Sequence, residues 1–280
     1  MTEELSILSP ANAAESKPAL HEEAAALEKQ AHNLRGDGKI EEAFETYQRA
    51  ALKYQTLKEH LKAAVCFASA ATCWNIHTGW QPLHQAAKTT YAAAREAMKA
   101  KNYEYARSLY RDAAILFEKE GDAEYYSICY MESQHADRRR WLEIFLHPKK
   151  TTSLNLSGLE IRWWSRLAAL YRWFVNVLGD LLWGHGELPF RTLAWIGFIL
   201  LGYALIYHLS GSILTGGVSR AITFSEALYM SVITFSTVGY GDYLPLGWVR
   251  GFTMLEALSG IFFMPLFLVG LTRRYLRMYR

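Results

Sequence analysis

The chain has 280 residues, enough for one large domain or two of ordinary size. Its formal net charge is only +3, so composition gives no argument for a nucleic-acid partner. Hydrophobic residues make up 51% of the chain but are unevenly distributed. Residues 1–160 are rich in Ala, Glu and Lys, whereas residues 186–272 are apolar and aromatic. This split predicts a polar domain followed by a membrane domain.

The three cysteines, Cys66, Cys73 and Cys129, all lie in the first half of the chain. An odd number without a CxxC or Cys/His spacing argues against a disulfide framework or a zinc site. We therefore expect small buried residues in a reduced cytoplasmic domain. His77 and His84, seven residues apart, are a weaker alternative for metal binding because no acidic partner pattern accompanies them.

Residues 1–20 are predicted to be disordered, and residues 21–146 contain an internal repeat of small and aromatic residues. The copies are Ala43, Tyr47, Ala50, Ala51 and Tyr54; Ala63, Phe67, Ala70, Ala71 and Trp74; Ala106, Tyr110, Ala113, Ala114 and Phe117; and, more weakly, Ala87, Tyr91, Ala94 and Met98. Alternate copies lie 43 or 44 residues apart. Small residues on one helical face let neighbouring helices approach closely, so the pattern predicts helical hairpins stacked as a solenoid.

The Ala-x-x-x-Tyr spacing resembles tetratricopeptide-like repeats, although its period exceeds the usual length of about 34 residues. This resemblance implies an all-α repeat domain over residues 21–146 that binds a protein partner of unknown identity. Asp37-Gly38 and Gly121-Asp122 are turn signals between helices. Pro148, with the Thr, Ser and Asn residues after it, predicts a linker over residues 147–160.

A helix is expected over residues 161–183, with charged and polar side chains on one side and aromatic and aliphatic side chains on the other. A basic stripe beside an aromatic-rich face is typical of a helix lying in the membrane interface. The residues expected at the interface are Trp163, Trp164, Trp173, Arg162, Arg166 and Arg172. An amphipathic helix packed against the cytoplasmic domain is the alternative.

Residues 184–280 contain two segments that are apolar enough to cross a membrane. Leu193–Leu209, extended by residues 189–192, reaches the roughly 20 residues needed, and Trp248–Leu271 forms the second. Phe224–Ser236 between them is too short to cross and is interpreted as a re-entrant helix. Lys and Arg are scarce between the spans and frequent outside them, so both termini are predicted to be cytoplasmic. The expected location is the cell (inner) membrane, with a multi-pass topology.

A short motif, Thr237-Val238-Gly239-Tyr240-Gly241-Asp242, directly follows the re-entrant helix. Glycine at alternate positions permits backbone dihedrals denied to other residues, which lets successive carbonyl groups point at one axis. The motif resembles the selectivity-filter sequence of potassium channels, and this resemblance implies that the carbonyl groups of residues 237–240, with the Thr237 hydroxyl, replace the water around K⁺.

From about Gly184 to Arg280 the sequence resembles the two-transmembrane potassium channels of prokaryotes. The order of outer helix, pore helix, TVGYGD filter and inner helix carries this resemblance. It implies a homotetramer, because each subunit supplies a quarter of the filter, and K⁺ as the transported ion without another cofactor. Ile233 stands where some relatives have a Glu that pairs with the filter aspartate, so Asp242 lacks that partner.

Three residues of the second span are candidates for gating. Gly260 lies where the family often has a hinge, although a small residue at a helix contact is an equal alternative. Pro265 breaks a helical hydrogen bond and predicts a bend. Glu256 is the acid inside the span, and acids at membrane depth usually face protein or water. We favour a buried hydrogen bond behind the filter over a charge facing the cavity.

Together these features predict an all-α potassium channel, with K⁺, membrane lipids and further copies of the chain as partners. The repeat domain is expected to regulate or localise the pore. The alternative function is a membrane-anchored scaffold whose pore domain is silent, but intact filter glycines favour conduction. No nucleophile–base arrangement, metal motif or phosphate loop is found, so an enzyme is not expected.

Overall fold

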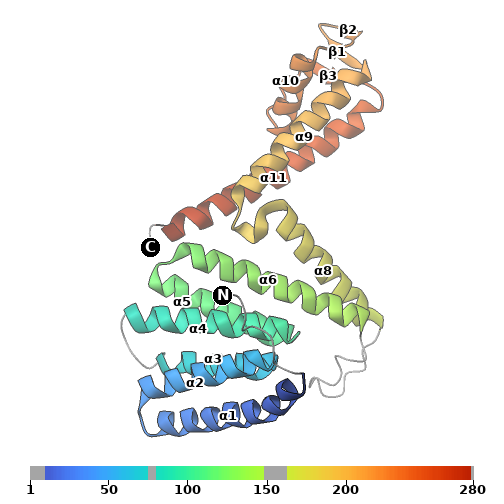
Figure 1. Cartoon of the computed structure of the whole chain (residues 1–280). Coiled ribbons are helices and arrows are strands. Elements are labelled where there is room, and N and C mark those ends of the chain that lie inside the picture. Colours follow the sequence, from blue (N-terminus) through green and yellow to red (C-terminus); the bar gives the residue numbers. More distant parts are fainter. Residues whose placement is uncertain (1–9, 75–79, 148–162, 279–280) are drawn as a thin grey trace, which may run out of the picture. The chain divides into compact units, whose positions relative to one another are not determined.

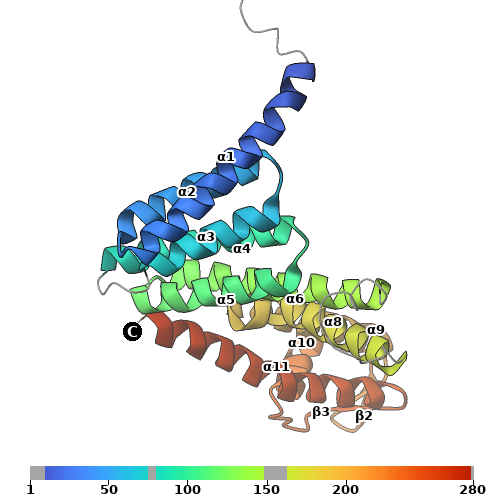
Figure 2. The ribbon, with the colours of Figure 1, turned by 90° about the horizontal axis from the view of Figure 1, so that it is seen from below.

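The computed structural model describes residues 10–74, 80–147 and 163–278. It divides the chain into two compact units, Met1–Asn176 and Val177–Arg280, which we call the first and second units. The first unit is a stack of helices, each packed against the next one along the chain (Figures 1 and 2). Its helices are α1 (Pro10–Gly36), α2 (Ile40–Thr56), α3 (His60–Trp74), α4 (Trp80–Lys99), α5 (Tyr103–Glu120) and α6 (Ala123–Leu146).

The predicted helical repeat is confirmed, and each copy of the sequence pattern occupies one helix. The four copies fall on α2, α3, α4 and α5 in turn. Their alanines are almost fully buried, and the large rings of Tyr54 and Phe117 fill the space between helices with exposures of 1% and 0%. The 43- or 44-residue spacing of alternate copies is therefore the length of one antiparallel helical hairpin.

The ends of these helices follow from local turn chemistry. Gly121 ends α5 with a positive φ of 88°, a backbone conformation that glycine adopts at little cost. Asn102 and Asp122 begin α5 and α6, because each side chain accepts a hydrogen bond from the backbone N–H three residues later. The predicted turn at Gly121-Asp122 is thus confirmed.

The expected disorder of residues 1–20 is wrong for residues 10–20, which belong to α1. Pro10 occupies the first position of that helix, where its missing N–H removes no hydrogen bond. The Ala and Glu residues that follow are strong helix formers. Residues 1–9 lie outside the described residues, and so does the predicted linker after His147.

The three cysteines are free and buried, as expected. Burial raises the pKa of Cys66 and of Cys129 to about 12, so these thiols stay protonated. His84 is hydrogen-bonded to Glu120, whereas His77 lies outside the described residues. Within the described ranges, no group of three His, Cys, Asp or Glu side chains is placed to hold a metal ion.

Helix α8 (Trp163–Trp183) begins in the first unit, where its polar face packs on α6. The Arg172 guanidinium lies 4.6 Å from the centre of the Trp141 ring, and Asn176 donates a hydrogen bond to the Gln134 backbone oxygen. Arg166 donates to the Phe145 oxygen at 3.4 Å. These contacts agree with the alternative of a helix packed against the first unit, but Arg166 and Arg172 remain exposed, so their position at the membrane interface stays a prediction. Arg162 lies outside the described residues.

The other face of α8 is exposed within the first unit. The side chains on this apolar face are Trp164, Leu167, Leu170, Tyr171 and Phe174, with exposures from 37% to 69%. They recur at three- and four-residue steps, so they form one continuous stripe. The sequence pattern thus predicted an amphipathic helix correctly, and the structure adds that polar residues of this helix contact α6.

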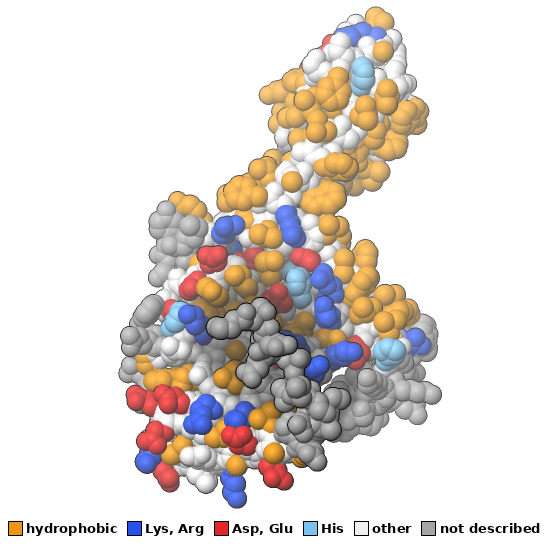
Figure 3. Space-filling model, viewed as in Figure 1, with side chains coloured by type: hydrophobic (Ala, Val, Ile, Leu, Met, Phe, Trp, Pro, Cys, Tyr) orange, Lys and Arg blue, Asp and Glu red, His pale blue; other side chains and the backbone are white. Residues whose placement is uncertain are grey.

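The second unit contains two long helices and a short helix, as the sequence predicted. It also contains a small sheet that was not predicted. Its elements after α8 are η1 (Gly184–Gly186), α9 (Pro189–Ser210), β1 (Ile213–Thr215), β2 (Val218–Arg220), α10 (Phe224–Phe235), β3 (Tyr243–Pro245) and α11 (Val249–Met278). The antiparallel strands lie in the order β2-β1-β3. Helices α9 and α11 are long and apolar enough to cross a membrane. Hydrophobic side chains cover much of the visible face of this unit in Figure 3.

The last turn of α8 is tied to the first turns of α9. Residues 184–186 all have positive φ, which reverses the chain within three residues. Arg191 then donates to the Asp180 oxygen, and Thr192 and Trp195 donate to backbone oxygens of Leu182 and Leu181. The entry into the first candidate span is thus rigidly defined.

Candidate functional site

The short helix α10 leads directly into the motif at residues 237–242. A capping box begins this helix: Thr223 accepts a hydrogen bond from the Glu226 N–H, and Glu226 accepts one from the Thr223 N–H. Glu226 also forms an ion pair with Arg220 on β2, and these contacts hold the pKa of Glu226 at about 2. The small sheet therefore anchors the start of α10. The other end of this helix, at Phe235, leads into the motif.

The backbone of the motif alternates in handedness. Thr237, Gly239 and Gly241 have φ of 61°, 51° and 79°, whereas Val238 and Tyr240 between them have negative φ. Positive φ at the two glycines matches the reason for expecting glycine there. Thr237 is a β-branched residue in the same region, which is a strained conformation often found at functional sites.

The start of the motif is held by the last carbonyl groups of α10. The N–H groups of Val238 and Gly239 both donate to the Ile233 oxygen, at 3.0 and 3.1 Å, and Thr237 donates to the Thr234 oxygen. The side chains of Val238 and Tyr240 are 52% and 72% exposed in the single chain. A rigid backbone with its outer surface uncovered is what a ring assembled from several chains would require.

Asp242 has a partner that the sequence did not indicate. Its side chain is hydrogen-bonded to Tyr229, which lies on α10 one turn before Ile233. The Tyr229 ring also contacts Tyr243 edge-on, with 5.7 Å between ring centres. The Ile233 side chain cannot form a hydrogen bond. Tyr229, one turn earlier, is therefore the residue of α10 that pairs with Asp242. A tyrosine eight residues before Thr237 was the signal available in the sequence.

Glu256 is completely buried and hydrogen-bonded to two other helices. Tyr207 on α9 donates to one carboxyl oxygen, and Ser231 on α10 contacts the other. An exposure of 0% in the single chain excludes a position facing an open cavity. Of the two arrangements that the sequence left open, the structure contains the buried hydrogen bond, which is made to Ser231 on α10.

Gly260 lies one turn after Glu256 and touches the end of α10. A methyl group added to Gly260 would lie 1.8 Å from the Phe235 backbone oxygen, far inside van der Waals contact. The helix α11 continues through both Gly260 and Pro265 without interruption. The alternative of a small residue at a helix contact is therefore the one that the structure contains, whereas a hinge at Gly260 and a bend at Pro265 stay predictions.

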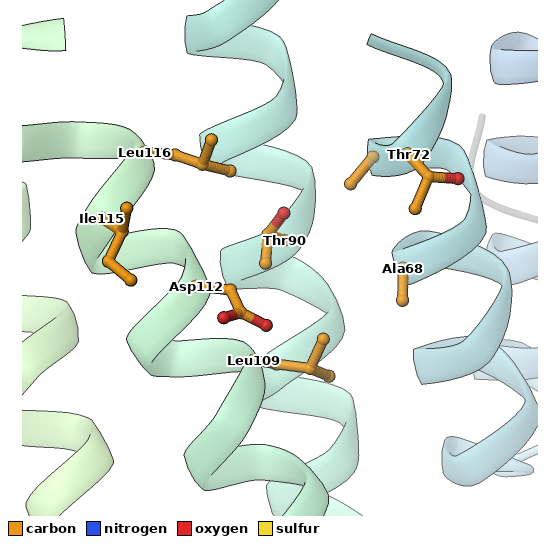
Figure 4. Close-up of a pocket in the computed structure, with 8 residues that line it drawn as sticks. Ala68, Thr72, Thr90, Leu109, Asp112, Ile115 and Leu116 are labelled. Atoms are coloured by element: carbon orange, nitrogen blue, oxygen red, sulfur yellow. The ribbon is translucent and has the colours of Figure 1, made fainter. Parts of the chain in front are cut away.

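The first unit has a pocket of its own between α3, α4 and α5 (Figure 4). Its volume is about 280 Å³, near the lower end for small-molecule sites, and Leu109, Ile115 and Leu116 form apolar walls. Burial raises the pKa of Asp112 at its edge. The Thr90 hydroxyl already donates to the Ala86 oxygen, so the polar groups available to a partner are acceptors.

Comparison with known families supports the division into two parts. Residues 192–277 match a family described as "Ion channel", and residues 17–131 match one described as "Soluble NSF attachment protein, SNAP". The first match covers nearly all of both candidate spans, together with α10 and the motif. This match supports an ion channel of the potassium-channel kind in residues 192–277, which are preceded by a tetratricopeptide-like helical repeat.

Two curated proteins are similar to part of the chain. Protein LctB of Geobacillus stearothermophilus is 29% identical over 130 residues, which is 43% of this chain and 88% of that protein. Protein LctB of Bacillus caldotenax is 33% identical over 87 residues, which is 28% of this chain and 64% of that protein. No solved structure matches the chain.

Proposed function

We propose that the chain is a potassium-selective channel in which four copies form one pore. Residues 237–242 form the selectivity filter, and the backbone carbonyl groups of residues 237–240 bind K⁺. The observation that carries this proposal is the alternation of backbone handedness at Thr237, Gly239 and Gly241, fixed by hydrogen bonds to α10. The exposed filter side chains of the single chain support assembly around a common axis.

The pore lies in the cell membrane with both termini in the cytoplasm. Helices α9 and α11 span the bilayer, and α10 enters it from outside. The end of α10 at Phe235 carries the partial negative charge of a helix C-terminus, which favours a cation in the cavity. Gly260, Pro265 and Glu256 on α11 are the residues through which the inner helix acts on the gate.

The apolar face of α8 rests on the cytoplasmic surface of the membrane. Its exposed stripe has the aromatic residues that prefer the headgroup region, Trp164 and Tyr171 among them. The direct connection of α8 to the first span supports this placement. Trp163 and Trp173 belong to the same helix.

Selective conduction is tested by measuring currents from the purified full chain in lipid bilayers under opposed Na⁺ and K⁺ gradients. The reversal potential should follow the K⁺ gradient, because the filter carbonyl groups replace the hydration of K⁺. Equal permeability for Na⁺ and K⁺ would contradict the proposal. A stable membrane protein without current would favour the scaffold instead.

The repeat domain is proposed to regulate the pore through α8. Deleting residues 1–150 should change the open probability and leave the reversal potential unchanged, because the filter lies in the other unit. A full-length chain with Arg172→Gln and Asn176→Ala should shift the open probability in the same direction, since both changes remove contacts of α8 with α6. Tyr171→Gln changes the exposed face of α8 and leaves its contacts with α6 intact. Its effect on the open probability therefore reports the lipid contact alone. If all three variants gate like the native chain, the repeat domain localises or assembles the channel.

A further inference from the structure

The carboxyl group of Glu256 is surrounded by hydroxyl groups and by no cation. Tyr207 reaches one of its oxygens from α9, and Ser231 reaches the other from α10. The other titratable side chain near it is Tyr203 on α9. Among the described residues of the second unit, the ion pairs are Arg191–Asp180 and Arg220–Glu226, and neither involves Glu256. A charge on this fully buried group would therefore have no opposite charge beside it.

Ser231 connects Glu256 to a second acceptor. The Ser231 hydroxyl oxygen lies 3.0 Å from the backbone oxygen of Leu200 on α9, as well as within hydrogen-bond distance of Glu256. A hydroxyl group has a single proton to donate. If Glu256 is ionised, that proton goes to the carboxylate, and the contact between Ser231 and the Leu200 oxygen holds no hydrogen bond.

A protonated Glu256 satisfies every one of these contacts. Its O–H donates to the Ser231 oxygen, Ser231 donates to the Leu200 oxygen, and Tyr207 donates to the remaining oxygen of Glu256. Each proton then has one acceptor, and no unpaired charge is buried. A chain of hydrogen bonds whose members are all satisfied is also the arrangement that best rigidifies a buried site.

We propose that Glu256 is protonated in the folded pore, and that Tyr207 and Ser231 are positioning residues that hold it in a neutral chain of hydrogen bonds. This chain of hydrogen bonds joins the proposed outer, pore and inner helices, α9, α10 and α11, at one level. The proposal rests on the assigned role of residues 237–242 as the filter. A protonated Glu256 would anchor α10 to α11 without placing a negative charge at this carboxyl group in any of the subunits.

The first test is the infrared spectrum of the full chain in lipid at neutral pH. The difference between the native protein and Glu256→Gln should contain the C=O band of a protonated carboxylic acid. Tyr207→Phe should move this band to higher frequency, because the carbonyl oxygen loses its donor. Glu226→Gln is the matched control, since Glu226 is ionised beside Arg220, and it should leave the band unchanged. Absence of the band in the native protein would overturn the proposal.

The second test compares substitutions by K⁺ flux and by thermal stability of the assembled channel. Glu256→Gln should keep both, because the amide carries a donor and an acceptor like the neutral acid, whereas Glu256→Ala should lose both. Ser231→Ala should weaken the assembly and Ser231→Thr should restore it, because the hydroxyl is the required group. Raising the pH should change gating of the native channel and not of Glu256→Gln.

These outcomes separate the inference from the proposed function. A carboxylic acid band together with an absence of K⁺ flux in the native protein would reject the channel function and support the protonated Glu256. Loss of assembly in Glu256→Gln, at the level of Glu256→Ala, would show that the charged form is needed and would reject the neutral chain.

Discussion

Replacing Gly239 with alanine is expected to abolish K⁺ current. The φ of this residue is 51°, in the left-handed region, which costs a non-glycine residue roughly 1–2 kcal/mol. In the proposed tetramer the cost arises in every subunit, at the same level of the proposed filter. The backbone relieves it by turning the peptide, so that carbonyl oxygens leave the pore axis. Currents of the variant and the native chain in lipid bilayers measure the effect.

The control for Gly239→Ala is Gly217→Ala. Gly217 lies between β1 and β2 with a φ of 83°, and an added methyl group would meet nothing within 4 Å at either glycine. The two substitutions therefore impose the same kind of backbone strain, one inside the motif at residues 237–242 and one outside it. Gly217→Ala should conserve current and selectivity. A K⁺-selective current from Gly239→Ala would contradict the assigned filter.

Replacing Gly260 with alanine is expected to displace the end of α10 and to remove both current and assembly stability. The new methyl group would lie 1.8 Å from the Phe235 oxygen and 2.8 Å from the Phe235 carbonyl carbon. Backbone atoms cannot turn aside as a flexible side chain can. Overpacking in protein cores typically costs about 1–3 kcal/mol, and a backbone clash belongs at the upper end of that range. Thermal unfolding of the assembled protein in lipid measures the loss.

Gly251→Ala is the matched control on the same helix. Gly251 belongs to α11, and an added methyl group there meets nothing within 4 Å. Alanine favours a helix over glycine by up to about 1 kcal/mol, so stability should stay the same or rise slightly. If Gly260 is a hinge and not a contact, Gly260→Ala will alter open probability while the assembly keeps its thermal stability. That result would contradict the expectation.

Much of the fold was predictable because its signals are local. The spans α9 and α11 are long runs of apolar residues, and the helix α10 stands before the motif at 237–242. The alternation of Ala with Tyr, Phe or Trp indicated the repeat helices, since only small residues allow helices to approach so closely. The composition of residues 1–20 was misleading, because Pro10 and the alanines after it form part of α1.

The sequence by itself determined the two kinds of domain, the spans and the ion-channel motif, because hydrophobic length, helical periodicity and glycine spacing depend on neighbours along the chain. Only the tertiary structure decided which partners the chemically important residues have. Tyr207 and Glu256 are distant in sequence, yet they meet because α9 and α11 cross at that level. Gly260 reaches Phe235, and the polar face of α8 reaches α6, for the same reason. A pattern within one helix identifies its faces, but what covers each face depends on how separate helices pack.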